Sequence, residues 1–349
     1  MAQDIRIAIL GTGHMAQTFA IALASIDGVT LAGFCSRDIE RAKAMATYHG
    51  APASYGGIDE ILADPAVDAL YIANDNAGHA AAAIAALEAG KAVLCEKPCG
   101  IDAAEAAAIA KTAARTGQLF MEAIPTPFIP AVAAILETAR KGDLGQIRRF
   151  AADFGYVASP QSHPGCFSPI GGGVLLDRGI YLATLALLVM GPAIKVQAEI
   201  LKAADGIDVE AWINLTHEGG ATSVLGTSLT CELPNRLDIS GTSGSAWVEA
   251  PLLAAERYGI SHHGLPQRAQ PSRGGFVSRL KQKPTLRRAL SVLRAARSPQ
   301  LSYGHSLYRG EIEHFRDLLR SGATESPVLP ASLSVAAMTI LDQARASAS

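Results

Sequence analysis

The first 125 residues alternate short apolar runs with helix-like segments, and this alternation restricts the possible folds more than any other feature. The runs that read as strands lie at 5–10, 30–35, 67–73, 91–95 and 119–123, with helical patterns at 14–25, 40–49, 79–89 and 103–116. Apolar strands separated by helices are typical of a parallel sheet covered on both faces. Residues 1–125 are therefore predicted to form one α/β domain.

Residues 126–349 are predicted to form a second α/β domain around a different kind of sheet. Residues 207–216 alternate apolar and polar side chains, the pattern of a strand with one solvated face. Further strands are predicted at 147–157, 194–201, 221–231, 236–240 and 246–249, and closing helices at 310–320 and 332–345. Long strands joined by short turns indicate a large, open, mainly antiparallel sheet.

Composition excludes several classes of protein. The chain of 349 residues is 49% apolar and 18% charged, which argues against disorder, and its net charge of −2 gives no general attraction to nucleic acid. The longest apolar run, 182–191, is far shorter than the roughly 20 residues of a membrane span, and the N-terminus lacks the pattern of a secretory signal. Five cysteines without a Cys-x-x-Cys spacing indicate reduced thiols. We therefore expect a cytoplasmic protein.

One stretch differs from the rest in charge. Residues 257–309 contain eleven of the 30 Lys and Arg residues and none of the 32 Asp and Glu residues. Three interpretations stay open: a solvated excursion, a lid over an anionic substrate, and a contact with a membrane surface or another polyanion.

A glycine-rich turn points to a nucleotide site. Gly11-Thr12-Gly13-His14-Met15-Ala16 follows the first predicted strand directly and opens a helix. In that context two glycines permit a tight turn and a close approach of backbone to pyrophosphate, and the helix N-terminus attracts the phosphates. The sequence therefore predicts a dinucleotide-binding domain of the Rossmann type.

The end of the second predicted strand indicates which dinucleotide is preferred. A site for NAD is expected to carry Asp or Glu there, to accept a hydrogen bond from the ribose 2′-hydroxyl. Here Ser36 and Arg37 occupy that place, and Asp38 is expected to cap the following helix. A hydroxyl and a guanidinium suit a 2′-phosphate, so NADP is favoured over NAD.

Lys97 is the first candidate for catalysis. It follows the strand predicted at 91–95, inside Cys95-Glu96-Lys97-Pro98, so we expect it at the carboxyl end of the parallel sheet, where ligands bind. Glu96 beside it is a candidate to contact the nicotinamide ring.

Asp177 and Tyr181 are the other two candidates. They follow three glycines at 171–173 and are four residues apart, so both are predicted to lie on one helix face, with Arg178 pointing elsewhere. We interpret Tyr181 as the carrier of the substrate proton, with a pKa lowered by the Lys97 ammonium, and Asp177 as the group that orients this pair or holds a substrate hydroxyl. This chemistry requires no metal.

These segments resemble the Gfo/Idh/MocA oxidoreductase family. The resemblance is carried by residues 11–16, 73–79, 89–98 and 171–181, and Phe120-Met121-Glu122-Ala123 resembles the branch with dimeric dihydrodiol dehydrogenase and NADP-dependent xylose dehydrogenase. It implies a Rossmann domain followed by an α/β domain whose large open sheet is often used for dimer packing. It also implies NADP as cofactor and a sugar, sugar derivative or cyclic diol as substrate.

The predicted function is therefore hydride transfer between NADP and a secondary hydroxyl or hemiacetal carbon, by a homodimer or higher homo-oligomer. The alternatives are a non-catalytic NADP-binding regulatory protein on the same fold and an adaptor that binds anionic surfaces through 257–309; Lys97 and Tyr181 favour the enzyme. The predicted cofactor-binding residues are Gly11, Thr12, Gly13, His14, Met15, Ser36, Arg37, Asn74, Asn76, His79, Glu96 and Lys97.

Two departures from the family pattern bear on the substrate and the cofactor. The turn at 74–76 reads Asn-Asp-Asn where the family usually has Thr-Pro-Asn, and Pro125 and Pro127 stand where the branch typically has Trp and Arg. The surroundings of the substrate or nicotinamide are thus expected to differ from those of the branch.

Overall fold

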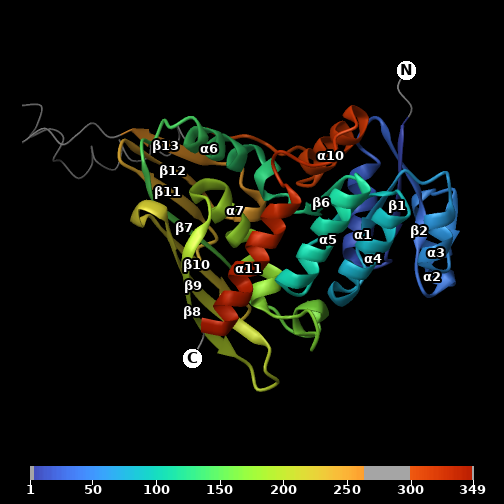
Figure 1. Cartoon of the computed structure of the whole chain (residues 1–349), viewed down its shortest axis with the longest axis horizontal. Coiled ribbons are helices and arrows are strands. Elements are labelled where there is room, and N and C mark those ends of the chain that lie inside the picture. Colours follow the sequence, from blue (N-terminus) through green and yellow to red (C-terminus); the bar gives the residue numbers. More distant parts are fainter. Residues whose placement is uncertain (1–3, 263–298, 348–349) are drawn as a thin grey trace, which may run out of the picture.

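The structure, a computed structural model, describes residues 4–262 and 299–347. Its strands form two sheets, here called sheet A and sheet B, which lie on opposite sides of the molecule with helices between them (Figure 1). None of the helices within the described ranges is both long and apolar enough to cross a membrane.

Sheet A is parallel throughout, as the alternation of the first 125 residues predicts. Its strand order is β3-β2-β1-β4-β5-β6. Strand order reverses between β1 and β4, which makes the carboxyl ends of these two strands the expected ligand crevice. Its strands are β1 (Ile5–Leu10), β2 (Val29–Cys35), β3 (Ala53–Tyr55), β4 (Ala69–Ile72), β5 (Ala92–Glu96) and β6 (Phe120–Ala123).

Five helices accompany sheet A. Contacts of α1 with α2, and of α4 with α5, group them into layers on the two sides of the sheet. They are α1 (His14–Leu23), α2 (Ile39–His49), α3 (Ile58–Ala63), α4 (Asn76–Glu88) and α5 (Ala103–Thr116). The prediction missed the short elements β3 and α3. It also began α4 three residues late, because Asn76 and Gly78 are weak helix formers.

Sheet B has the order β13-β12-β11-β7-β10-β9-β8. The pair of β7 and β10 is parallel and the other described pairs are antiparallel, so the prediction of a mainly antiparallel sheet is confirmed. Its strands are β7 (Ile147–Gly155), β8 (Ala193–Lys202), β9 (Asp208–His217), β10 (Thr222–Ser228), β11 (Leu237–Gly241), β12 (Gly244–Val248) and β13 (Tyr258–His262).

One face of sheet B is open. Along β9 the apolar positions 209, 211, 213 and 215 are buried, whereas Trp212 on the other face is 40% exposed. Both tryptophans of the chain lie on this open face over a glycine of the adjacent strand, Trp212 over Gly226 and Trp247 over Gly259. Each indole ring lies so close to the glycine backbone that a side chain at the glycine position would collide with it.

In the second half of the described chain, α6 (Pro130–Arg140), α7 (Ile180–Met190) and α11 (Ala331–Ser347) contact strands of sheet B, whereas α10 (Arg309–Ser321) lies against the first half. Helix α11 contacts α7 and β8 as well as α5, and α10 contacts α1, so the end of the chain packs on both halves (Figure 1). The division into domains at 125/126 stays a prediction.

Candidate active site and cofactor crevice

The glycine-rich turn after β1 has the shape of a phosphate cradle. Gly11 has φ +127°, and a Cβ there would lie 2.3 Å from the carbonyl oxygen of Ala73, at the end of β4. At Gly13, by contrast, a Cβ would meet no protein atom within 4 Å. Gly13 is the N-cap residue of α1 and has no side chain to cap the helix. The first N–H groups of α1 are thus available to an anion, and the residues present fit a bound dinucleotide.

The residues predicted to choose the cofactor lie at the rim of this crevice. The side chain of Arg37 is 96% exposed, and its Nη2 lies 3.6 Å from Oδ2 of Asp75, in the turn after β4. The Ser36 hydroxyl oxygen accepts a hydrogen bond from the N–H of Asp38 at 3.2 Å. Asp38 caps α2 by accepting from the N–H groups of Glu40 and Arg41, as predicted.

The turn after β4 is held by its own predicted residues. His79 is buried, with Nδ1 2.7 Å from the Pro98 carbonyl oxygen and Nε2 3.0 Å from that of Asn74. Nδ2 of Asn76 donates to the carbonyl of Gly171 at 2.7 Å, which connects the cofactor crevice to the glycine run of the second half. His79 thus lies between the carbonyl groups that flank the turn, and the assignment of these residues to a cofactor stays a prediction.

Lys97 and Asp177 come together at the carboxyl end of β5. Nζ of Lys97 donates to Oδ1 of Asp177 at 2.7 Å and to its carbonyl oxygen at 3.0 Å. Burial disfavours both charges, but the attraction and hydrogen bonding between the two groups outweigh this effect. The pKa of Lys97 is therefore raised and that of Asp177 is lowered. The thiol of Cys166 also hydrogen-bonds to the Asp177 carboxylate. The pair is therefore ionised across the neutral pH range.

Tyr181 lies beside this pair, and one expectation about it is wrong. Nζ of Lys97 is 5.2 Å from the centre of the Tyr181 ring, so the two groups are neighbours as predicted. Yet the pKa of Tyr181 is raised well above its usual range, chiefly by burial and then by the nearby Glu96, Tyr308 and Asp177. The Lys97 charge is balanced by Asp177 and does not draw the proton off the phenol, so Tyr181 is a neutral hydroxyl in this structure.

The helix that carries these groups also differs from the prediction. Residues Leu175–Gly179 form one π-helical turn, and the α-helix begins only at Ile180. Arg178, which the sequence predicts only to point elsewhere than Asp177 and Tyr181, is fully buried, with its guanidinium carbon 3.6 Å from the centre of the Tyr156 ring. It donates to the carbonyl oxygens of Tyr156, at 2.7 Å, and Ser228. In this π-helical turn the Asp177 carboxylate contacts Lys97, and the Arg178 side chain holds the segment against sheet B.

Glu96 is buried under the site. Its carboxylate accepts a hydrogen bond from the Tyr71 hydroxyl, and burial raises its pKa. Glu311, at the start of α10, is likewise buried, and its pKa is raised well above the usual range by burial and by the charge of Glu96. Two acids buried near the site therefore both have raised pKa values.

Sequence reasoning missed Tyr156, Cys166, Tyr308 and Glu311. The hydroxyl of Tyr308 is 4.0 Å from Sδ of Met15, which brings the start of α10 against the glycine-rich turn. No spacing in the sequence connects residue 308 to residue 15, because only the fold of the whole chain places them together. Most of the basic stretch 257–309 lies outside the described residues, so its three interpretations stay open.

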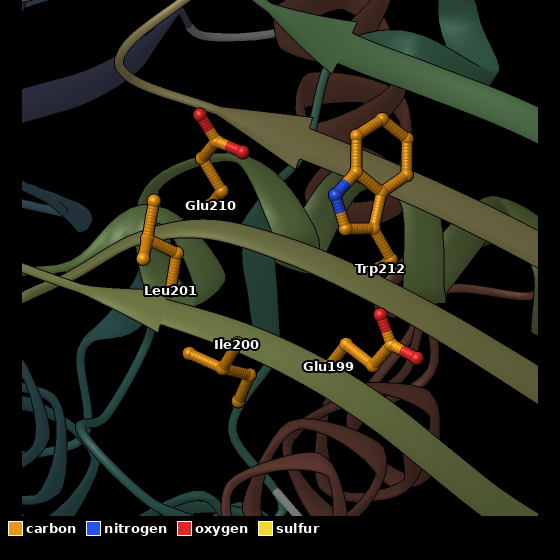
Figure 2. A pocket seen from close by; sticks show the side chains of 5 residues that line it. All are labelled: Glu199, Ile200, Leu201, Glu210 and Trp212. Atoms are coloured by element: carbon orange, nitrogen blue, oxygen red, sulfur yellow. The ribbon is translucent and has the colours of Figure 1, made fainter.

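A shallow pocket is found away from these groups, on β8 and β9. Its lining residues are Glu199, Ile200, Leu201, Glu210 and Trp212 (Figure 2). Glu199 pairs with Trp212 and Leu201 with Glu210 across the two strands, so these four share the open face of sheet B. In the parts of the chain that the structure describes, no three His, Cys, Asp or Glu side chains gather as metal ligands.

Comparisons with known proteins agree with this architecture. Residues 5–124 match the model of an oxidoreductase family with an NAD-binding Rossmann fold, and residues 132–247 match the GFO/IDH/MocA C-terminal domain. Trans-1,2-dihydrobenzene-1,2-diol dehydrogenase from Bos taurus is 32% identical, over 89% of this chain and 86% of the relative. The protein of the same name from Mus musculus is 31% identical, over 98% and 96%.

Solved structures show the same fold. KijD10, a 3-ketoreductase from Actinomadura kijaniata in complex with NADP and TDP-benzene, has a TM-score of 0.79 at 24% identity, covering 99% of this chain and 98% of that one. An aldose-aldose oxidoreductase from Caulobacter crescentus complexed with glycerol has a TM-score of 0.80 at 20% identity, with the same coverage. The chain belongs to the Gfo/Idh/MocA oxidoreductase family, with dihydrodiol dehydrogenases among its relatives.

Proposed function

We propose that this chain transfers hydride between NADP and a secondary hydroxyl or hemiacetal carbon of a sugar, sugar derivative or cyclic diol. The observation that carries the proposal is the contact of Lys97 with Asp177 and the ring of Tyr181, at the sheet edge that also holds the glycine-rich turn. The relatives named trans-1,2-dihydrobenzene-1,2-diol dehydrogenase support the same reaction class.

The residues have distinct parts in this chemistry. When bound, NADPH supplies the hydride and NADP accepts it. The neutral Tyr181 hydroxyl donates a proton to the substrate oxygen during reduction of a carbonyl, which leaves a phenolate; in the reverse direction, that phenolate accepts the proton of the alcohol as its carbon loses hydride. Lys97 uses a remaining N–H to stabilise charge on that oxygen. Asp177 holds Lys97 charged and in place, through the 2.7 Å contact.

Cofactor choice is assigned to the rim of the crevice. The exposed Arg37 guanidinium, with the Ser36 hydroxyl beside it, is proposed to bind the 2′-phosphate of NADP. Gly11 and Gly13 allow the pyrophosphate to approach the start of α1. The NAD-binding Rossmann match over residues 5–124 supports the dinucleotide itself, and Arg37 supports the phosphorylated form.

A homodimer is proposed to form through the open face of sheet B. Trp212 and Leu201 are 40% and 55% exposed on that face, beside the shallow pocket of Figure 2. An exposed apolar patch on a strand pair favours burial against another protein surface. Sedimentation of the wild type and of Trp212→Arg tests this: the variant is expected to shift toward the monomer, and an unchanged mass contradicts the assignment.

A substrate screen tests the reaction. The absorbance of NADPH is followed as the enzyme is mixed with NADPH or NADP and a panel of keto sugars, aldoses, nucleotide sugars and cyclic diols. Lys97→Met serves as the inactive control. The proposal expects turnover of at least one member by the wild type alone. Binding of NADPH without turnover of any class would instead favour a regulatory protein on this fold.

A further inference from the structure

A pair of exposed charges spans the mouth of the nucleotide crevice. Arg37 follows β2 and Asp75 follows β4, and in sheet A these strands lie on either side of β1. Nη2 of Arg37 is 3.6 Å from Oδ2 of Asp75. The contact therefore connects the two sides of the turn that carries Gly11 and Gly13.

Asp75 occupies a position where its carboxylate would ordinarily bond to its own helix. It is the N-cap residue of α4, and an aspartate at that position usually accepts a hydrogen bond from a first-turn N–H. Its side chain makes no capping bond, whereas Asp38, the N-cap residue of α2, accepts from the N–H groups of Glu40 and Arg41. Of two aspartates at equivalent positions, one caps its helix and the other is directed toward Arg37.

We propose that Asp75 sets how strongly this chain prefers NADPH over NADH, because it competes with the 2′-phosphate for Arg37. The inference rests on the proposed function, in which Arg37 binds that phosphate. A phosphate monoester brings about 1.5 to 2 negative charges, so binding it requires Arg37 to exchange partners close to a like charge. The 2′-hydroxyl of NADH brings none. Asp75 therefore weakens the binding of NADPH and leaves that of NADH nearly unchanged.

The size of the effect follows from exposure. The side chains of Arg37 and Asp75 are 96% and 90% exposed, so water and salt screen both their attraction and the repulsion of a phosphate. We expect Asp75→Asn and Asp75→Ala to tighten NADPH binding about two- to fivefold at low salt, and less at high salt. Since Asp75 makes no capping bond, neither variant is expected to change the thermal midpoint appreciably.

The test is a fluorescence titration of the full chain with NADPH and with NADH. Glu137→Gln is the matched control, because it removes the acid of another exposed ion pair, with Arg140 at 2.7 Å, on α6. Tighter NADPH binding in both Asp75 variants, but not in the control, with NADH changed by less than about twofold, supports the inference. In an Arg37→Ala background, Asp75→Asn should increase NADPH affinity less, because Asp75 and the 2′-phosphate no longer have a guanidinium for which to compete.

Other outcomes overturn it. Unchanged NADPH affinity in both Asp75 variants, with normal binding by the wild type, removes Asp75 from cofactor choice and leaves the proposed function intact. Equal tightening of both cofactors, or a gain undiminished without Arg37, shows that Asp75 does not act through that guanidinium. Failure of the wild type to bind NADPH is a different result, because it removes the proposed function itself.

Discussion

Two ion pairs, at the two ends of the same crevice, differ in almost every respect except their charges. The Lys97–Asp177 pair has an N–O distance of 2.7 Å and side chains that are 15% and 24% exposed; the Arg37–Asp75 pair has a distance of 3.6 Å and side chains that are 96% and 90% exposed. Water competes little with the first pair and strongly with the second. The buried pair can fix a charge and a geometry for chemistry, while the exposed pair can exchange partners with a ligand.

The largest expected effect concerns the buried pair. Lys97→Met removes the ammonium that faces Tyr181 and the substrate oxygen, so kcat is expected to fall about 100- to 1,000-fold. NADPH affinity, measured by fluorescence titration, should change far less, since the phosphate cradle is untouched. Equal losses in turnover and in cofactor binding would show that the two ends of the crevice do not act separately.

The two glycines of the turn are expected to fail in different ways. Gly11→Ala places a Cβ 2.3 Å from the Ala73 carbonyl oxygen at φ +127°, so both thermal stability and NADPH binding should fall, the latter more than about tenfold. Gly13→Ala meets no protein atom within 4 Å, so it should keep the thermal midpoint and weaken only the binding of NADPH. Loss of stability in both variants would contradict the assignment of Gly13 to ligand approach.

The Lys97–Asp177 pair is expected to contribute to stability in a way that depends on pH, and Asp177→Asn tests this. Leaving Lys97 without its partner should lower the free energy of unfolding by about 3 kcal/mol near neutral pH. Because the pKa of Asp177 is lowered in the fold, its contribution is present above the ordinary carboxyl pKa of about 4 and is lost as the pH falls through the lowered value. Urea unfolding at several pH values should therefore show the difference narrowing in acid, and a constant difference would contradict this account.

The smallest effect belongs to the exposed pair. Arg37→Ala should weaken NADPH binding by about tenfold at most, change that of NADH little, and so narrow the ratio of the two dissociation constants. Lys43→Ala, which opens an exposed pair with Glu40 on α2, serves as the control. Equal affinities for NADPH and NADH in the wild type would end the assignment of Arg37 to the 2′-phosphate.

Much of this architecture was predictable from local pattern. The apolar strands of sheet A, the alternation in β9, the turn at Gly11 and the Asp38 cap depend on nearby residues, and the structure has all four. What failed depends on burial by distant parts of the chain. The raised pKa of Tyr181 follows from an environment built by several elements, and no spacing reveals it.

The same reason explains Arg178 and Asp75. Helix spacing predicts only that Arg178 points elsewhere than Asp177; the Tyr156 ring and the two carbonyl oxygens that bury its guanidinium come from distant parts of the chain. Asp75 has the sequence context of a helix cap, and only the position of Arg37 across β1 shows why its side chain does not cap.

Tyr181→Phe tests the central claim most directly, since it removes one oxygen atom from the centre of the proposed chemistry and leaves the ring beside Lys97. With a substrate identified by the screen, the account predicts that turnover falls about 100- to 10,000-fold while the NADPH dissociation constant stays within about twofold of the wild type. Tyr48→Phe, on the exposed part of α2, should behave as the wild type. A Tyr181→Phe variant that retains turnover would contradict the claim that Tyr181 and Lys97 handle the substrate proton together.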